Sequence, residues 1–367
     1  MNKFVFLISG CILMTATFFS CVEEATGGMK AKPGALGRLN EIVVIASQNL
    51  WESSVKDSFD FYFESAYPIM PAPEPMFDIR HFTPTEIYNE PLRQELRTYV
   101  LLVDLSEKET KTIEMIRTDL GEERYNQALA GEVNSMVVRD KWARGQMIIY
   151  LLGKNKDDLI STIRKNYPAV SRRINIHDKE QLQANIYTRG INLGLTERIE
   201  ETYGIKINIP ATYKVAQELP DENFIWLRKD DESSTMNIMI TKVPYENQSQ
   251  FSVQNMKELR DKLGLFVTSP EPGSVMVIND KDLPVYDYSY EIDGNYTREI
   301  RGIWEMTKDY FGGPFASYLI MDKSNNNLLF IDTFVYAPGK SKRNMMQQLD
   351  LLVKTADLSE QNISSQG

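Results

Sequence analysis

Cysteine is almost absent from this chain of 367 residues, which has only Cys11 and Cys21. The body of the protein therefore cannot form disulfides, and hydrophobic cores have to hold it together. It also lacks the residue type needed for a thiol nucleophile or a thiolate metal site. Both cysteines lie in an N-terminal segment of distinct composition, which is considered separately below.

Histidine is equally scarce, with only His81 and His177 in the whole sequence. No G-x-S-x-G, H-E-x-x-H or G-x-x-x-x-G-K motif is present, so the common serine hydrolase, zinc protease and phosphate-loop signatures are missing. Paired carboxylates could still hydrolyse glycosides, but 51 acidic residues leave the pair unidentified. We expect structural roles for both histidines, and we predict no catalytic residue, metal site or cofactor.

Long apolar runs are missing beyond the N-terminus, where Lys3 precedes a nearly continuous apolar stretch from Phe4 to Phe19. About 16 residues at 1.5 Å each span roughly 24 Å, which is short of a hydrocarbon core of about 30 Å. A positive start followed by a short apolar run is typical of a secretory signal. We therefore predict a signal peptide at residues 1–20 rather than a membrane-spanning helix.

The segment Phe18-Phe19-Ser20-Cys21 resembles the lipobox of bacterial lipoproteins. The resemblance implies that Cys21 carries acyl chains, which attach the protein to a membrane without a spanning helix. Residues 21–35 are rich in glycine and small residues and are predicted to form a flexible tether. We expect an outer-membrane lipoprotein that faces the periplasm or the exterior. An ordinary secretory cleavage site with an incidental cysteine is the alternative.

Acidic residues outnumber basic ones, 51 to 41, and the net charge is −10. A protein that binds nucleic acid or an anionic membrane surface usually has an excess of lysine and arginine. We therefore expect no nucleic-acid partner and no electrostatic membrane binding. The expected partners are the membrane, through the acyl chains on Cys21, and other proteins of the cell envelope.

Residues 36–204 are predicted to form an N-terminal α/β domain, because apolar strands alternate with helical patterns. A helix is expected around residues 55–66, a short helix with Ile160 and Ile163 should stop before Pro168, and helical segments should follow up to Gly204. The dense prolines of residues 68–75 favour a stiff extended loop. The predicted strands cover residues 39–46, 98–105, 136–138 and 146–152.

Residues 205–358 are predicted to form a C-terminal domain with an antiparallel sheet of about five or six strands. Two helices, one ending at Gly264 and one closing the domain, should cover this sheet, and residues 359–367 should be a disordered tail. The fold class is therefore α+β with two domains. The predicted strands cover residues 224–228, 236–243, 285–292, 296–306, 315–322 and 328–337.

The hairpin around Asp293-Gly294 allows two registers. A two-residue loop would place Tyr288 opposite Glu299, whereas a three-residue loop, residues 293–295, would place Tyr288 opposite Ile300. The longer loop keeps the apolar residues of both strands together, so we predict that register despite the Asp-Gly hairpin signal.

Two resemblances extend this picture. The segments ALGRLNEIVVIA and ESAYPIMPAPEPMFDIRHFTP, together with the lipobox, resemble an uncharacterised family of Bacteroidota lipoproteins with a domain of unknown function. GIKINIPATYKV and the pattern after it are similar to the photosystem-P-subunit/Mog1-like sandwich over residues 205–358. The first resemblance implies a lipid-anchored envelope protein, and the second implies a fold whose members mostly bind or scaffold.

These observations favour a lipid-anchored envelope protein that binds a partner or assists assembly without catalysis. A carboxylate-based envelope hydrolase acting on glycan or peptide is the alternative, and a small-ligand carrier is a third possibility. A deep cleft with two nearby carboxyl groups would favour the enzyme, and a closed apolar pocket between sheet and helix would favour the carrier.

Overall fold

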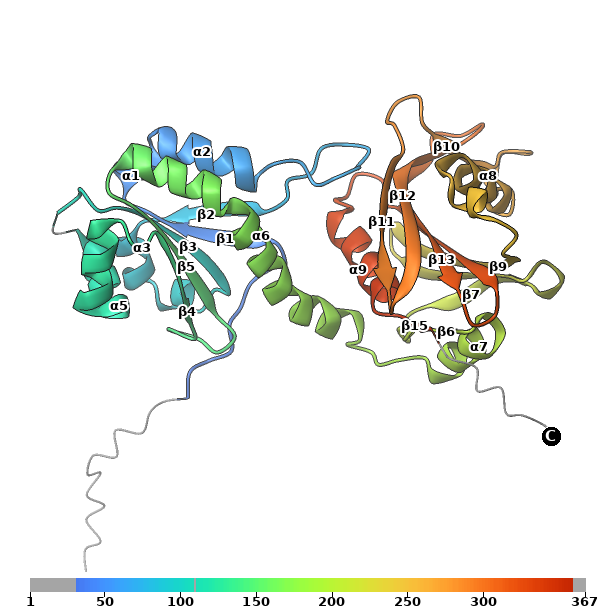
Figure 1. Cartoon of the computed structure of the whole chain (residues 1–367), viewed down its shortest axis with the longest axis horizontal. Coiled ribbons are helices and arrows are strands. Elements are labelled where there is room, and N and C mark those ends of the chain that lie inside the picture. Colours follow the sequence, from blue (N-terminus) through green and yellow to red (C-terminus); the bar gives the residue numbers. More distant parts are fainter. Residues whose placement is uncertain (1–30, 109, 359–367) are drawn as a thin grey trace, which may run out of the picture.

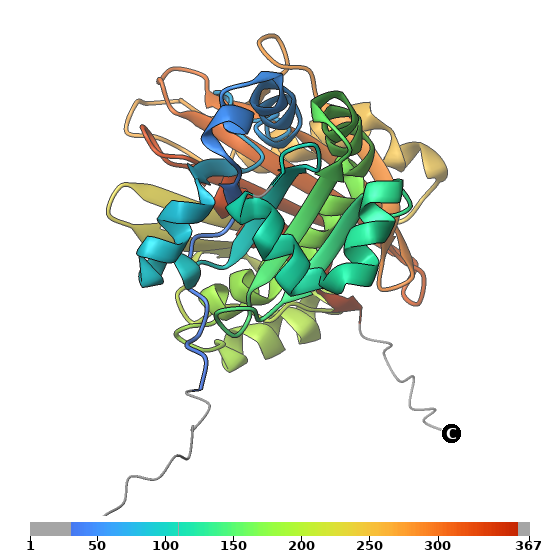
Figure 2. The ribbon, with the colours of Figure 1, turned by 90° about the vertical axis from the view of Figure 1, so that its left-hand side faces the viewer.

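The computed structural model describes residues 31–108 and 110–358. It has an α+β fold in which two halves, each built on its own sheet, lie side by side (Figures 1 and 2). The predicted signal peptide, Cys21, most of the predicted tether and the predicted tail lie outside the described residues. Among the described residues, no helix is both long and apolar enough to cross a membrane.

The N-terminal half contains a five-stranded sheet with the order β2-β1-β3-β5-β4. Its first four strands are parallel, and β4 is an antiparallel edge strand. The central strands are buried on both faces, which explains their continuous apolar sequences. The strands are β1 (Glu41–Ile45), β2 (Asp78–Phe82), β3 (Thr98–Asp104), β4 (Ser135–Arg139) and β5 (Met147–Gly153).

Helices cover both faces of this sheet (Figure 1). On one face, α1 (Gln48–Trp51), α2 (Ser54–Phe63) and the N-terminal part of α6 (Lys156–Ile186) bury a shared apolar cluster. On the other face, α3 (Pro84–Asn89) and α5 (Lys111–Ala130) form a second cluster, and α4 (Pro91–Gln94) follows α3 directly. The predicted α/β architecture of this half is confirmed.

Helix α6 (Lys156–Ile186) continues through Pro168, so the prediction of a short helix that stops before this proline is wrong. Pro168 lies on the exposed side of α6, where a lost backbone hydrogen bond and a bend are best tolerated. The opposite side buries Leu159, Ile163, Val170 and Ile174 against the N-terminal sheet. This burial offsets a proline cost of about 3 kcal/mol.

The C-terminal half contains an eight-stranded antiparallel sheet with the order β10-β12-β13-β14-β9-β8-β7, and β11 also pairs with β12. Strands β7 and β10 were not predicted, which explains why the sequence suggested fewer strands. The strands are β7 (Lys214–Leu219), β8 (Phe224–Asp231), β9 (Ser234–Pro244), β10 (Met276–Asn279), β11 (Tyr286–Ile292), β12 (Asn295–Met306), β13 (Gly312–Asp322) and β14 (Asn327–Tyr336).

Helices also cover both faces of the C-terminal sheet. Helix α8 (Val253–Gly264) covers one face, and α7 (Leu193–Tyr203) and α9 (Arg343–Lys354) cover the other. Leu182 and Ile186 at the end of α6 belong to the same core as α7 and α9, so α6 takes part in both halves. Two short strands, β6 (Ile205–Lys206) and β15 (Asp357–Leu358), pair beside this core, and 3₁₀ turns occupy Pro220–Glu222 and Gln248–Phe251.

The β11–β12 hairpin has the two-residue loop, so the predicted three-residue loop is wrong. Ile292 pairs with Asn295, which sets Tyr288 opposite Glu299. Asp293 and Gly294 both have positive φ, 47° and 70°, as a type I′ turn requires, and such a turn matches the natural twist of a hairpin. The apolar residues were a misleading guide because this face of the hairpin does not line a purely apolar core.

The described end of the predicted tether is attached to the N-terminal half. The backbone N–H of Ala35 donates to the Arg144 carbonyl at 2.8 Å, and that of Arg144 donates to the Pro33 carbonyl at 2.8 Å. Lys32 Nζ also donates to the Asp140 carbonyl. The chain thus enters the folded body at Lys32, three residues before the predicted end of the tether.

Candidate functional site: a cavity between the two halves

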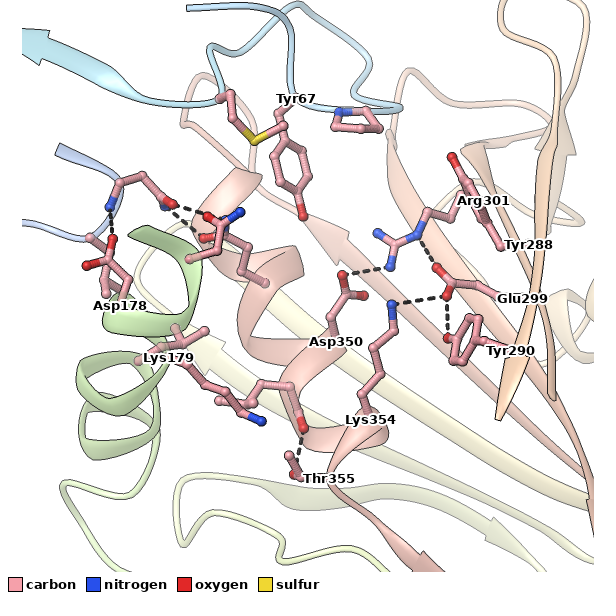
Figure 3. A pocket seen from close by; sticks show the side chains of 18 residues that line it. Tyr67, Asp178, Lys179, Tyr288, Tyr290, Glu299, Arg301, Asp350, Lys354 and Thr355 are labelled. Carbon is pink, nitrogen blue, oxygen red and sulfur yellow. Dashed lines mark hydrogen bonds and ion pairs between the residues drawn. The ribbon is translucent and has the colours of Figure 1, made fainter. Parts of the chain in front are cut away.

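A cavity of about 670 Å³ lies between the two halves (Figure 3). One wall comes from the chain before β1, the proline-rich arm (residues 67–76) and α6; the other comes from β11, β12 and α9. Side chains of the first wall include Leu39, Asn40, Tyr67, Met76, Asp178 and Leu182. Side chains of the second include Tyr288, Tyr290, Glu299, Arg301, Asp350 and Lys354.

A network of charged side chains forms the sheet side of the cavity. Arg301 on β12 is buried, and its Nε donates to Glu299 two residues earlier on the same strand. Its Nη2 reaches Asp350 Oδ2 of α9 at 2.6 Å. Lys354 Nζ, one turn later on α9, lies 3.1 Å from Glu299 Oε2. The four side chains of this ion network, Glu299, Arg301, Asp350 and Lys354, therefore join helix to sheet.

Tyrosine hydroxyls complete the ion network. Tyr290 donates to Glu299, and Tyr318 of β13 donates to Asp350 Oδ1 at 2.6 Å. Burial, followed by the nearby carboxylate charges, raises the pKa of both tyrosines, so they stay protonated and act as donors. Burial alone would lower the pKa of Arg301, but Asp350, Tyr318 and Glu299 together outweigh burial and raise this pKa well above its usual value.

The proline-rich arm brings Tyr67 into the cavity from the N-terminal half. Ala66 and Pro75 pair at its base, which closes the arm into a loop. Glu74 accepts hydrogen bonds from the backbone N–H groups of Lys342 and Arg343 at 2.7 and 2.8 Å, at the start of α9. A carboxylate at this position satisfies free N–H groups of the helix end and complements its dipole. The arm is therefore fixed to the same helix that carries Asp350.

Further contacts between the halves surround Arg343 and Asn40. Arg343 is buried, and its Nη2 binds Asp78 Oδ2 at 2.7 Å while Nη1 donates to the Pro75 carbonyl. Asn40 Nδ2 donates to Asn344 and Gln347 of α9, both at 2.8 Å. These contacts set the distance between the two walls, so the cavity has a defined shape before any ligand enters.

The two histidines lie outside the cavity lining. His81 on β2 stacks on Trp51 with ring centroids 4.7 Å apart, and its Nε2 lies 3.1 Å from the Ala46 carbonyl. His177 is buried within α6, and burial followed by the charge of Arg97 lowers its pKa to about 4. The described residues contain no cluster of three or more potential metal ligands among His, Cys, Asp and Glu.

No residue of the ion network was predicted from the sequence. Its signal was present, because tyrosines alternate along residues 286–290 and Glu299 and Arg301 alternate with apolar residues on the next strand. The wrong hairpin register hid it by placing Tyr288 opposite Ile300. The contributions of Tyr67 and Asp350 come from distant segments and have no local signal.

The fold and cavity define a two-part α+β protein with a ligand-sized space between its parts. Residues 35–187 match the family model of a domain of unknown function (DUF8532), and residues 192–355 match that of another (DUF4837). Each half of the chain thus matches a domain family of unknown function, which confirms the expected relation to uncharacterised families. No curated protein shows significant similarity to the chain.

Two solved structures resemble part of the fold. LpqN of Mycobacterium tuberculosis, described as involved in cell envelope biogenesis, is 12% identical, with a TM-score of 0.28 over 42% of this chain and 83% of that chain. The Ran-binding protein Mog1p of Saccharomyces cerevisiae is also 12% identical, with a TM-score of 0.27 over 42% of this chain and 90% of that chain. Similarity at this level says nothing about function.

Proposed function

We propose that the protein is a lipid-anchored, non-catalytic binding protein of the cell envelope. Acyl chains on Cys21 would hold it to the outer membrane, and the cavity between the halves would bind its ligand. The observation that carries the proposal is a cavity of about 670 Å³ with aromatic and apolar walls and a few convergent polar groups. These are the general properties of a small-ligand site.

The carboxylates of the cavity do not favour the hydrolase alternative. Glu299 accepts from Arg301 at one oxygen and from Tyr290 and Lys354 at the other. Asp350 is bound by Arg301 and Tyr318. A glycosidase needs one carboxyl group that releases a proton and another that attacks or activates water. Here each carboxylate oxygen of the pair already has a partner in the protein.

The membrane part of the proposal predicts that Cys21→Ser releases the protein from the membrane. Serine cannot form the thioether that carries the acyl chains, and one lost chain already removes about 0.8 kcal/mol per buried CH₂. In a detergent phase-partition experiment, the native protein should enter the detergent phase and the variant the aqueous phase. A variant that stays with the detergent, or a native N-terminus without acyl groups in mass spectrometry, would contradict lipid anchoring.

The ligand part predicts that Leu351→Trp abolishes binding, because the indole would fill space that the half-buried Leu351 leaves open. Ligand-observed NMR with a library of small organic fragments should give binders for the native protein, and these should be lost in the variant. Leu265→Trp is the control, since Leu265 is 57% exposed and does not line the cavity. Circular dichroism shows whether both variants are folded. Equal binding by a folded Leu351→Trp variant would contradict the assignment.

A further inference from the structure

The chemistry of the cavity narrows the class of its ligand, if the proposed binding function holds. The ion network contains two carboxylates and two cations, and each charge is paired within it. Asp178 is also paired, because Arg97 Nε lies 3.4 Å from its Oδ1. Lys179 on α6 also lines the cavity and has no ion pair among the described residues. Because its side chain is exposed to solvent, its attraction for an anion is weak.

The cavity presents hydrogen-bond donors that carry no uncompensated charge. The carboxylates engage Nε and Nη2 of Arg301, which leaves Nη1 without a carboxylate partner among the residues described. The Tyr67 hydroxyl and the Arg301 guanidinium point toward one another across the cavity (Figure 3). Burial and the charge of Asp350 raise the pKa of Tyr67, so its hydroxyl keeps a proton to donate. Arg301 is a hydrogen-bond partner of the Tyr67 oxygen, which leaves the Tyr67 O–H to donate to an acceptor oxygen of a ligand.

Flat aromatic surfaces lie beside these donors. Tyr288 and Tyr290 share one face of β11, and Tyr67 comes from the opposite half. Tyr288 is 43% exposed although it lines the cavity, so its ring is available to a ligand. Such a ring packs against the C–H face of a pyranose, and neighbouring polar groups bind the hydroxyls at the sugar's edge. Asn40 and Gln347 also line the cavity, but their amide groups are hydrogen-bonded to each other.

Other ligand classes fit this arrangement less well. A purely apolar chain would bury the Tyr67 O–H without an acceptor, which costs roughly 1–3 kcal/mol. An anion would find no unpaired cation within the ion network, and a cation would find no unpaired carboxylate there. The volume lies within the range of about 300–1,000 Å³ for small-ligand sites and admits two pyranose rings.

We propose that the cavity binds a neutral saccharide of one or two rings, with Tyr288 stacking on a ring and the Arg301–Tyr67 pair holding one of its oxygens. The saccharide is held without covalent change, because the carboxylates that could attack it remain in the ion network.

Saturation-transfer NMR and calorimetry with the full mature chain in detergent micelles test this proposal. The probes are three neutral disaccharides (cellobiose, maltose and N,N′-diacetylchitobiose), glucose with glucose 6-phosphate, and a neutral tripeptide amide. We expect at least one neutral disaccharide to bind and the tripeptide not to.

Tyr288→Ala should weaken this binding at least tenfold and Tyr67→Phe about threefold to tenfold. Tyr310→Ala, which alters a fully exposed tyrosine outside the cavity, should leave it unchanged.

The outcomes separate this proposal from the broader one. If fragments bind the native protein but not Leu351→Trp, and no neutral saccharide binds, the saccharide assignment is wrong and the ligand site stands. Stronger binding of glucose 6-phosphate than of glucose would show that the site prefers an anion, and the proposal of a neutral ligand would then be wrong. If the tripeptide alone binds, the ligand is a peptide. If no fragment and no saccharide binds, both proposals fail.

Discussion

Asp332→Ala is expected to lower the free energy of unfolding by about 3–5 kcal/mol, measured by urea denaturation. Asp332 on β14 is fully buried and accepts a hydrogen bond from Arg260 Nε of α8 at 3.1 Å. Arg260 is also fully buried, and its guanidinium lies 3.8 Å from the centre of the Phe315 ring. Removal of the carboxylate would leave this cation without a counter-charge inside an apolar core.

A double variant that removes both charges tests whether the unpaired Arg260 cation causes this loss of stability. Burial lowers the pKa of Arg260 and raises that of Asp332, which disfavours the charged form of both groups. The attraction between the two charges acts in the opposite direction and favours their charged forms. The double variant Arg260→Met/Asp332→Leu should therefore recover most of the lost stability. Asp230→Ala is the matched control, because Asp230 pairs with Arg228 on the surface and should change stability by less than about 1 kcal/mol. An equal loss in both single variants would contradict this account.

Arg301→Met is expected to cost a similar amount, about 3–5 kcal/mol, because it leaves two carboxylates of the ion network without their shared cation. Glu299 is buried and would keep only Lys354 as a cationic partner, whereas Asp350 would keep only the Tyr318 hydroxyl. The variant should also lose the Arg301–Asp350 ion pair between β12 and α9, so that only Lys354 and Glu299 still form an ion pair between them. Urea denaturation reports the stability, and amide hydrogen exchange should show faster opening of α9 than of α8.

A neighbouring arginine provides the control for Arg301. Arg298 lies on the same strand and pairs with Asp287 of β11, but both side chains are partly exposed. Arg298→Met should therefore change the free energy of unfolding by less than about 1 kcal/mol. If Arg298→Met and Arg301→Met destabilised the protein equally, the ion network would have no special role in holding α9 on the sheet.

Much of the fold could be predicted from local patterns. The buried strands β1, β3 and β5 are continuous apolar runs, and the long C-terminal strands combine such runs with alternation, so both were found. Strand β2 was missed because its sequence, DIRHF, is half polar and its side chains are mostly partly exposed. The four-residue strand β10 was too short to show a pattern.

Proline and glycine predicted some helix ends and turns correctly and others wrongly, because tertiary packing also determines where a helix ends. Gly204 ends α7 in a left-handed conformation, with φ 73°, as its position predicts. Pro168 does not end α6, because the apolar side chains before and after it fall on one buried face. The Asp-Gly turn signal was the better guide to the β11–β12 hairpin than the pairing of apolar residues.

The cavity could not be predicted, because its walls come from segments that are far apart in the sequence. Tyr67 and Arg301 are brought together by contacts of Glu74 and Asn40 with α9, and single-sequence patterns do not report such contacts. The alternation of tyrosines on β11 was visible, but its meaning depends on the strand paired with it. A correct register would have placed Tyr288 beside Glu299 and pointed to a polar face.

Because α6 takes part in both halves, dividing the chain would have a consequence beyond lost stability. At 1.5 Å per residue its 31 residues form a rod about 46 Å long. A cut between residues 187 and 192, where the two family matches meet, would leave both sheets whole. One fragment would then keep Tyr67 and the other Arg301. Neither isolated domain would contain the complete cavity, so neither would be suitable for a ligand screen.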